Sequence, residues 1–289
     1  MADCYGNDTS KAIQVAKSLY GEQVELRVID DGYENLVIVA DERELIRFPR
    51  SEEIWSRGKL ERYVLQRLSN SEMPIPKLIC VSDDPAYSQM TFLPGSLLDA
   101  GQVRSLPQDT QARIGEQVAQ FAFGLHSTLM PDEIRPLIQP ATGGTYDEYL
   151  QRVLVDRTDS NPAVDALAKE FYGRWCQKTQ SHEAVVHDDL HTGNLVFDDA
   201  YNLVGVLDFG ATCIGTPEQD LRQMYRLGPA AFEAAVVTYE RLSGVPFDRE
   251  AAITWTVTQE LGAYCREESG IAHNRAWENL LLWFPDRLT

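Results

Sequence analysis

The sequence predicts an α+β protein with two lobes, the first built on an antiparallel sheet and the second, larger one mainly helical. Short segments of alternating apolar and polar residues dominate the N-terminal part of the chain, whereas apolar residues at helical spacing dominate the remainder. The turn-forming pair Pro94-Gly95 lies where one pattern gives way to the other. We therefore predict a first lobe over residues 1–93 and a second lobe over residues 94–289.

The first lobe reads as an antiparallel meander followed by one helix and two further strands. Apolar residues recur at four-residue steps at Leu60, Val64 and Leu68, which predicts a helix with one apolar face. Two prolines then break this helix. Alternation and turn residues predict the strands Gln23–Val28, Leu36–Ala40, Glu44–Phe48, Leu78–Val81 and Gln89–Leu93.

The second lobe is predicted to be helical except between Ala184 and Phe209. There, short apolar runs separated by polar loops indicate short strands. Elsewhere helical stripes stand out, and a helix is also expected from Arg249 to Ser269. The stripes comprise Ile114, Val118, Phe121, Leu125 and Leu129, and later Leu167, Phe171 and Trp175.

The composition is that of a globular protein and excludes several classes of partner. The chain has 289 residues, 44% of them hydrophobic, and a formal net charge of -18. A negative field of this size repels nucleic acid and anionic lipid surfaces and attracts cationic small molecules. No continuous apolar stretch is long enough to cross a bilayer, and the five cysteines form no C-x-x-C pair. We expect a cytoplasmic monomer that binds neither nucleic acid nor membranes.

Two motifs between the predicted strands carry the chemistry. Residues 187–194 have the form H-x-D-x-x-x-x-N, and Asp208-Phe209-Gly210 follows them, a combination that protein kinases use. Phosphoryl transfer needs one carboxylate facing the incoming hydroxyl, and oxygen ligands that hold Mg²⁺ against the nucleotide phosphates. Asp189 fits the first role, and Asn194 and Asp208 fit the second. The motifs predict a kinase that uses magnesium and a nucleoside triphosphate.

Two readings from other classes remain open at this point. His187, Asp189 and His191 alternate, so on an extended strand they would share one face and could bind zinc in a metal-dependent hydrolase. Alternatively, the chain could be an inactive kinase-like binding module. The intact acidic residues favour an active kinase, in which His187 packs beneath the loop and supports its backbone.

The chain resembles the aminoglycoside and macrolide phosphotransferase family, relatives of protein kinases, over nearly its whole length. The resemblance rests on the segments VVHDDLHTGNLVFD, GVLDFG and PEQDL, where the family loop typically reads H-G-D-L-H-x-G-N. It implies a bilobal protein-kinase-like fold. It further implies that Asp189 is the catalytic base, that Asn194 and Asp208 bind magnesium, and that Asp220 is a structural brace of the loop.

The resemblance also implies a nucleotide site in the first lobe. The family pairs a cationic side chain on the third strand with a helix glutamate, and here the strand offers Arg47 and the helix offers Glu61. Because the strand continues as R-x-P-R, Arg50 is an alternative phosphate contact. The covering turn, which ends at Asn35, contains a single glycine where protein kinases have three.

Segment 89–95 resembles the hinge between kinase lobes. The backbone groups of Thr91 and Leu93 would meet a purine there, with Met90 behind it, so both ATP and GTP remain open as donors.

The acceptor is the least determined part of the prediction. A polycationic acceptor needs carboxylates beyond the base. Glu260, Tyr264 and Glu267 recur along one helix face, with Glu268 adjacent, and in related kinases the C-terminal helices line the acceptor cleft. The resemblance and the acidic charge favour an aminoglycoside, phosphorylated to confer resistance. Macrolides come second, followed by metabolites such as choline, homoserine or a sugar.

Overall fold

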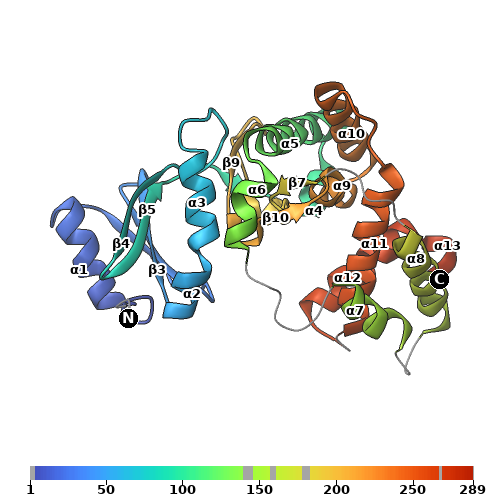
Figure 1. The fold of residues 1–289 in the computed structure, drawn as a ribbon, viewed down its shortest axis with the longest axis horizontal. Helices are drawn as coiled ribbons and strands as arrows, with labels where there is room; N and C mark the ends of the chain where they lie inside the picture. The colour runs from blue at the N-terminus through green and yellow to red at the C-terminus, as the bar shows by residue number, and fades with distance from the viewer. Residues whose placement is uncertain (1–3, 139–145, 157–160, 178–182, 267–268, 289) are drawn as a thin grey trace.

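The computed structural model describes residues 4–138, 146–156, 161–177, 183–266 and 269–288. Its architecture confirms the predicted α+β organisation. Figure 1 shows a sheet with three helices at one end of the molecule and a larger, mainly helical part at the other. The termini lie far apart, one in each part.

The N-terminal lobe is a five-stranded antiparallel sheet with the strand order β1-β2-β3-β5-β4. The strands are β1 (Leu26–Ile29), β2 (Asn35–Ala40), β3 (Glu44–Pro49), β4 (Leu78–Asp83) and β5 (Ala86–Thr91). Strand β5 begins at Ala86 rather than at the predicted Gln89, because Ala86, Tyr87 and Ser88 already pair with β4. The predicted hinge segment, residues 89–95, therefore begins within β5 and continues beyond the end of the sheet.

Three helices accompany this sheet: α1 (Thr9–Tyr20), α2 (Glu52–Arg57) and α3 (Lys59–Arg67). The first was missed from the sequence, although Asp8 caps it by accepting a hydrogen bond from the Lys11 N–H. Its buried face is made of Ala12 and Ala16, whose small side chains leave a weak helical stripe. The third is the predicted helix, and it carries Glu61 on the side facing β3.

The C-terminal lobe holds helices and five short strands, which form a two-stranded and a three-stranded sheet. Its strands are β6 (Ser96–Leu97), β7 (Ala184–Val186), β8 (Leu195–Phe197), β9 (Leu203–Val206) and β10 (Cys213–Gly215). Its helices are α4 (Ala100–Ser105), α5 (Gln108–Thr128), α6 (Pro131–Ile134), α7 (Tyr146–Leu150), α8 (Pro162–Gln177), α9 (Pro217–Leu221), α10 (Pro229–Ser243), α11 (Arg249–Arg266), α12 (Ile271–Trp283) and α13 (Pro285–Leu288).

Helix α5 is the longest helix of the lobe, and α10 packs along it (Figure 1). Gly115 permits this approach, because a Cβ atom there would lie 2.0 Å from the carbonyl oxygen of Ala231. One continuous core joins α5 to α3 and to Met90 of the sheet, so the two lobes share apolar packing. A second core lies among α8, α11 and α12.

The short strands place the polar loops of the predicted site side by side. Strand β7 pairs with β10, and β8 pairs with both β6 and β9. The loop from His187 leaves the end of β7, and the β8–β9 hairpin returns the chain to Asp208. The Leu207 N–H donates to the Asn194 carbonyl at 2.9 Å, which ties the two loops together.

Candidate active site

Asp189 is held in place by a side chain from its own loop. The Asn194 Nδ2 donates to the backbone oxygen of Asp189 at 3.0 Å and to its Oδ2 at 3.1 Å. Because His191 Nδ1 accepts the Gly193 N–H, His191 Nε2 carries the ring proton, and it faces Asp189 Oδ2 at 3.4 Å. Burial alone would raise the pKa of Asp189, but the hydrogen bond from His191 and nearby positive charge lower it overall. The carboxylate is therefore ionised at neutral pH, as a proton acceptor must be.

His187 is a buried support beneath this loop. Its Nε2 lies 3.0 Å from the Leu207 carbonyl, so this nitrogen carries the proton, and its Nδ1 accepts the Asp189 N–H at 3.3 Å. The ring packs against Phe209 with centroids 4.7 Å apart. Both ring nitrogens of His187 are hydrogen-bonded within the protein, whereas the zinc-binding alternative needs one of them as a metal ligand. In the described part of the chain, no three His, Cys, Asp or Glu side chains form a group that could hold a metal ion.

Asp220 braces the same loop from α9. Its carboxylate is fully buried and accepts the backbone N–H of His187 at 2.9 Å and that of Asp188 at 2.6 Å. His126 Nε2 lies 2.9 Å from Asp220 Oδ2, and its Nδ1 meets the Tyr239 hydroxyl at 2.9 Å. Burial works to raise the pKa of Asp220, yet His126 and the donated hydrogen bonds lower it overall. These contacts hold the backbone on the N-terminal side of Asp189.

Asn194 and Asp208 offer the oxygen ligands that magnesium prefers. Asp208 adopts a left-handed conformation, with φ 61°, and its Oδ1 accepts the Gly210 N–H at 3.2 Å. Its second carboxylate oxygen, and the Oδ1 of Asn194, have no donor among the described residues. A carboxylate and an amide oxygen at neighbouring loop ends fit a Mg²⁺ ion that takes its other ligands from phosphates and water.

Arg47 and Glu61 form an ion pair at the wall of a cleft beside Asp208. Arg47 Nη1 lies 2.7 Å from Glu61 Oε1, and both side chains are largely buried. The charge of Glu61, with smaller contributions from Asp208 and Glu34, raises the pKa of Arg47. The cleft has a volume of about 370 Å³, and Asn35, Arg47, Glu61 and Asp208 all line it. A guanidinium here suits the negative charge of nucleotide phosphates.

Arg50, the alternative phosphate contact, is instead engaged by the protein backbone. Its Nε donates to the Gly32 carbonyl at 2.9 Å, its Nη2 to Asp30, and its Nη1 to the Gly6 carbonyl at 2.7 Å. Arg50 thus fastens the β1–β2 turn to the segment before α1. Its donors face protein oxygens, whereas Arg47 faces the cleft.

In the predicted hinge, the backbone N–H of Leu93 has no hydrogen-bond partner among the described residues, whereas those of Thr91 and Phe92 do. The Thr91 N–H donates to the Lys77 carbonyl at 3.0 Å, and the Phe92 N–H donates to the Arg43 carbonyl at 2.7 Å. The Leu93 N–H has no acceptor within the described residues. Met90 is buried and joins the shared core. The Leu93 N–H can therefore serve a base edge, as sequence reasoning expected of this position.

The predicted acceptor residues are not brought together as a free acidic surface. Glu260 is buried, and its Oε1 lies 2.5 Å from the Arg226 Nε, so its charge is compensated. Tyr264 stacks between His273 and Trp277, with centroids 4.4 and 5.2 Å away. Glu267 and Glu268 lie outside the described residues.

The sequence matches the model of the phosphotransferase enzyme family (APH) over residues 25–255. This span includes most of both lobes, the Arg47–Glu61 pair and the loops around Asp189. The chain belongs to this phosphotransferase family. A search of curated proteins gave no match.

Solved structures with the same fold include phosphotransferases that act on antibiotics. The GDP complex of aminoglycoside 2'-phosphotransferase-IIIa is 15% identical, with a TM-score of 0.76, and covers 97% of this chain and 99% of that one. The streptomycin–ATP complex of APH(2")-IIa is 16% identical, with a TM-score of 0.63 and coverage of 94% and 96%. Macrolide 2'-phosphotransferase MphH from Brachybacterium faecium is 19% identical, with a TM-score of 0.66 and coverage of 93% and 97%. At these identities the likeness shows the fold.

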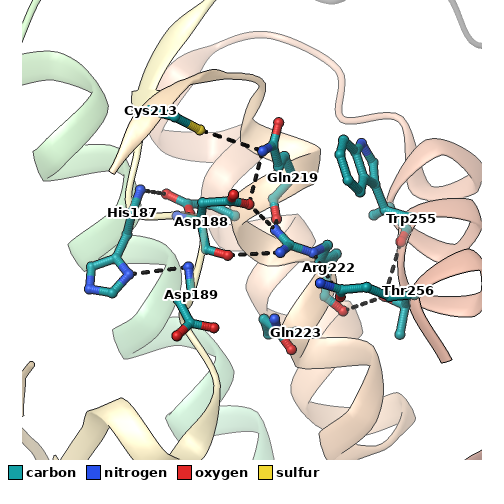
Figure 2. Close-up of polar contacts among 12 residues, drawn as sticks. His187, Asp188, Asp189, Cys213, Gln219, Arg222, Gln223, Trp255 and Thr256 are labelled. Carbon is teal, nitrogen blue, oxygen red and sulfur yellow. Dashed lines mark hydrogen bonds and ion pairs between the residues drawn. The ribbon is translucent and has the colours of Figure 1, made fainter. Parts of the chain in front are cut away.

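Sequence reasoning missed a set of polar contacts on the far side of the phosphotransferase loop. Figure 2 shows the Asp188 carboxylate facing both Gln219 and Arg222, with Trp255 and Thr256 of α11 beyond Arg222. The available signal was Asp188 itself, which stands where the family loop typically has glycine.

No helix in the described part of this phosphotransferase has the length and apolar character to span a membrane.

Proposed function

We propose that this phosphotransferase transfers the γ-phosphoryl group of ATP or GTP to a hydroxyl of an aminoglycoside, with Mg²⁺ held by Asn194 and Asp208. The observation that carries the proposal is the placement of Asp189. Its ionised carboxylate is fixed by Asn194, and that same loop is tied to the loop of Asp208 beside the Arg47 cleft. Proton acceptor, metal ligands and phosphate contact thus meet at the junction of the two lobes.

Asp189 orients the acceptor hydroxyl and takes its proton as the new oxygen–phosphorus bond forms. Its lowered pKa suits orientation and late proton transfer, which is the role expected of a carboxylate in phosphoryl transfer. His187 and Asp220 keep the carboxylate in position through the backbone.

The nucleotide is held by charge on its phosphates and by the backbone at its base. Arg47, oriented by Glu61, faces the phosphates. Magnesium, when bound, neutralises phosphate charge and favours departure of the nucleoside diphosphate. Leu93 presents its backbone N–H to the purine, whereas the Thr91 N–H is engaged by the Lys77 carbonyl. Recognition through the backbone leaves both ATP and GTP possible.

The negative net charge supports a cationic acceptor, since it draws cations to the molecule. Solved relatives of the same fold are complexes with streptomycin, gentamicin and kanamycin. The compensated charge of Glu260 removes one of the carboxylates that sequence reasoning offered to such an acceptor. Macrolides and small metabolites are therefore retained as test acceptors.

Mass spectrometry of an acceptor panel tests the proposal directly. Aminoglycosides, macrolides, choline, homoserine and sugars are incubated with the protein, Mg²⁺ and either ATP or GTP. One added phosphoryl group on an aminoglycoside supports the proposal and names the donor. Modification of only a macrolide or a metabolite overturns the acceptor assignment and keeps the phosphotransferase chemistry.

Two substitutions separate the proposed roles. Asp189→Asn should keep magnesium-dependent nucleotide binding and lose transfer, because only the proton acceptor is removed. Asp208→Ala should lose the magnesium-dependent part of nucleotide affinity. Asp199→Asn, at an exposed aspartate in the β8–β9 turn, is the matched control. Equal loss of nucleotide binding in the first two variants would contradict the assignment.

A further inference from the structure

Asp188 adopts a backbone conformation that needs external support. Its φ is 66°, in the left-handed region that favours glycine, and it directly precedes Asp189. Asp is better tolerated there than most residues, because its short polar side chain can make local hydrogen bonds. The conformation is therefore held by the partners of Asp188, and those partners also set the direction in which the chain enters Asp189.

All three polar groups of Asp188 are held by the segment from α9 onward. The N–H donates to Asp220 at 2.6 Å. The backbone oxygen accepts Arg222 Nη2 at 2.7 Å, and the carboxylate oxygen Oδ1 lies 2.8 Å from Arg222 Nη1 and 2.9 Å from Gln219 Nε2. Arg222 thus binds both the side chain of Asp188 and its backbone carbonyl, which leads into Asp189.

Arg222 is itself rigidly placed. Its side chain is 3% exposed, and it begins the 3₁₀ segment Arg222–Leu227 that follows α9. Its Nε donates to Gln259 Oε1 at 3.2 Å, its guanidinium lies over the Trp255 ring at 5.3 Å, and its carbonyl accepts the Thr256 hydroxyl at 2.7 Å. Figure 2 shows this side chain spanning the space between the loop and α11. A side chain with so many fixed partners has one available position.

We propose that Arg222 is a positioning residue of the reaction, which holds Asp188 in its left-handed conformation and thereby aims the Asp189 carboxylate at the acceptor hydroxyl. The pair Asp188–Arg222 does the work that a glycine would do without help, since glycine adopts this conformation freely. Arg222 also fixes the distance between the loop and α11. The proposal rests on Asp189 being the proton acceptor.

The decisive prediction is rescue by glycine. Arg222→Gln should lower kcat by about 10²-fold, the effect of a small misplacement of a catalytic group, and leave the nucleotide KM little changed. Adding Asp188→Gly to Arg222→Gln should restore most of kcat, because the loop then reaches its conformation without the guanidinium. Arg222→Gln with Asp188→Ala is the control, because alanine removes the unpaired buried carboxylate but disfavours the left-handed conformation. A purely structural role would be rescued equally by alanine and by glycine, whereas a positioning role restores kcat with glycine alone.

A second, half-buried arginine that contacts the same 3₁₀ segment provides a control variant. Arg104 donates to the Arg226 carbonyl at 2.7 Å, at the other end of the same 3₁₀ segment, and no described contact joins it to the loop of Asp189. Arg104→Gln should therefore destabilise the protein without lowering kcat. Comparable kcat losses in Arg104→Gln and Arg222→Gln would overturn the proposal.

Hydrogen exchange provides a readout that needs no acceptor. In Arg222→Gln, the backbone N–H groups of residues 187–189 should exchange faster than in the wild type, and in Arg222→Gln with Asp188→Gly they should return toward the wild-type rate. Unchanged exchange in the single variant, or failure of the double variant to recover, would overturn the proposal. If no acceptor is phosphorylated, the proposed function fails and this exchange pattern still decides the role of Arg222.

Discussion

Asn194 donates one hydrogen bond to the Asp189 carboxylate and another to the Asp189 backbone, at 3.1 and 3.0 Å. The amide nitrogen thus orients the proton acceptor and leaves the amide oxygen for a metal ion. Asn194→Ala should lower kcat by about 10²-fold or more, because both functions are lost together. Steady-state kinetics over a range of Mg²⁺ concentrations measures this, and the magnesium requirement should rise as well.

Asn202→Ala is the matched control, because Asn202 makes the analogous contact to Asp198 in an exposed turn away from the loop.

Asn194→Asp tests whether Asp189 is the group whose protonation limits the rate in acid. It keeps an oxygen ligand but places a second carboxylate against Asp189, and a like charge raises the pKa of its neighbour. The acid limb of its rate profile should therefore lie at higher pH than in the wild type, where the pKa of Asp189 is lowered. An unmoved limb would argue against Asp189 as the titrating group.

Arg47 and Arg50, which the sequence could not distinguish, are predicted to have different phenotypes. Arg47→Ala should weaken nucleotide binding by roughly tenfold to a hundredfold, as expected for a lost charged contact. Arg50→Ala should mainly lower the melting temperature, because its donors bind the Gly6 and Gly32 carbonyls. Calorimetric titration with Mg²⁺ and nucleotide, beside thermal unfolding, compares the two. A greater loss of affinity in Arg50→Ala would reverse the assignment.

The residues whose proximity the sequence could predict are those connected by short stretches of chain. Asp189 and Asn194 share one loop, and a single hairpin leads from there to Asp208. Their spacing is fixed by local geometry, so a motif of defined length determines which groups meet. The helix carrying Glu61 was also recognised, because its apolar residues recur at helical spacing.

The residues that sequence reasoning missed or left open depend on contacts between distant segments. Asp188 and Arg222 are 34 positions apart, and nothing in either local pattern points to the other. Periodicity placed Glu260 on a helix but could not show that Arg226 neutralises it. Helix α1 was overlooked because its buried face is made of alanines, which carry little apolar signal.

Asp220 is predicted to stabilise the fold in a pH-dependent way. Its pKa is lowered in the folded protein, so its contribution is present above the unfolded value of about 3.9 and is lost as the pH falls through the folded value. Asp220→Asn should cost about 3 kcal/mol at neutral pH, because one backbone N–H would then face an amide donor. Urea unfolding at several pH values measures the difference between variant and wild type. The difference should shrink in acid, and a constant difference would contradict the lowered pKa.

The contact between α5 and α10 is predicted to tolerate no side chain at Gly115. A Cβ atom there would lie 2.0 Å from the Ala231 oxygen and 2.8 Å from its carbonyl carbon, and helix backbone cannot turn aside as a side chain can. Gly115→Ala should therefore cost about 3 kcal/mol of unfolding free energy. Gly173→Ala, in α8 with nothing within 4 Å of the added carbon, should instead stabilise the protein by up to about 1 kcal/mol, because alanine favours helix. Urea unfolding should give changes of opposite sign for the two variants, whereas stabilisation by both would mean that α5 and α10 lie further apart.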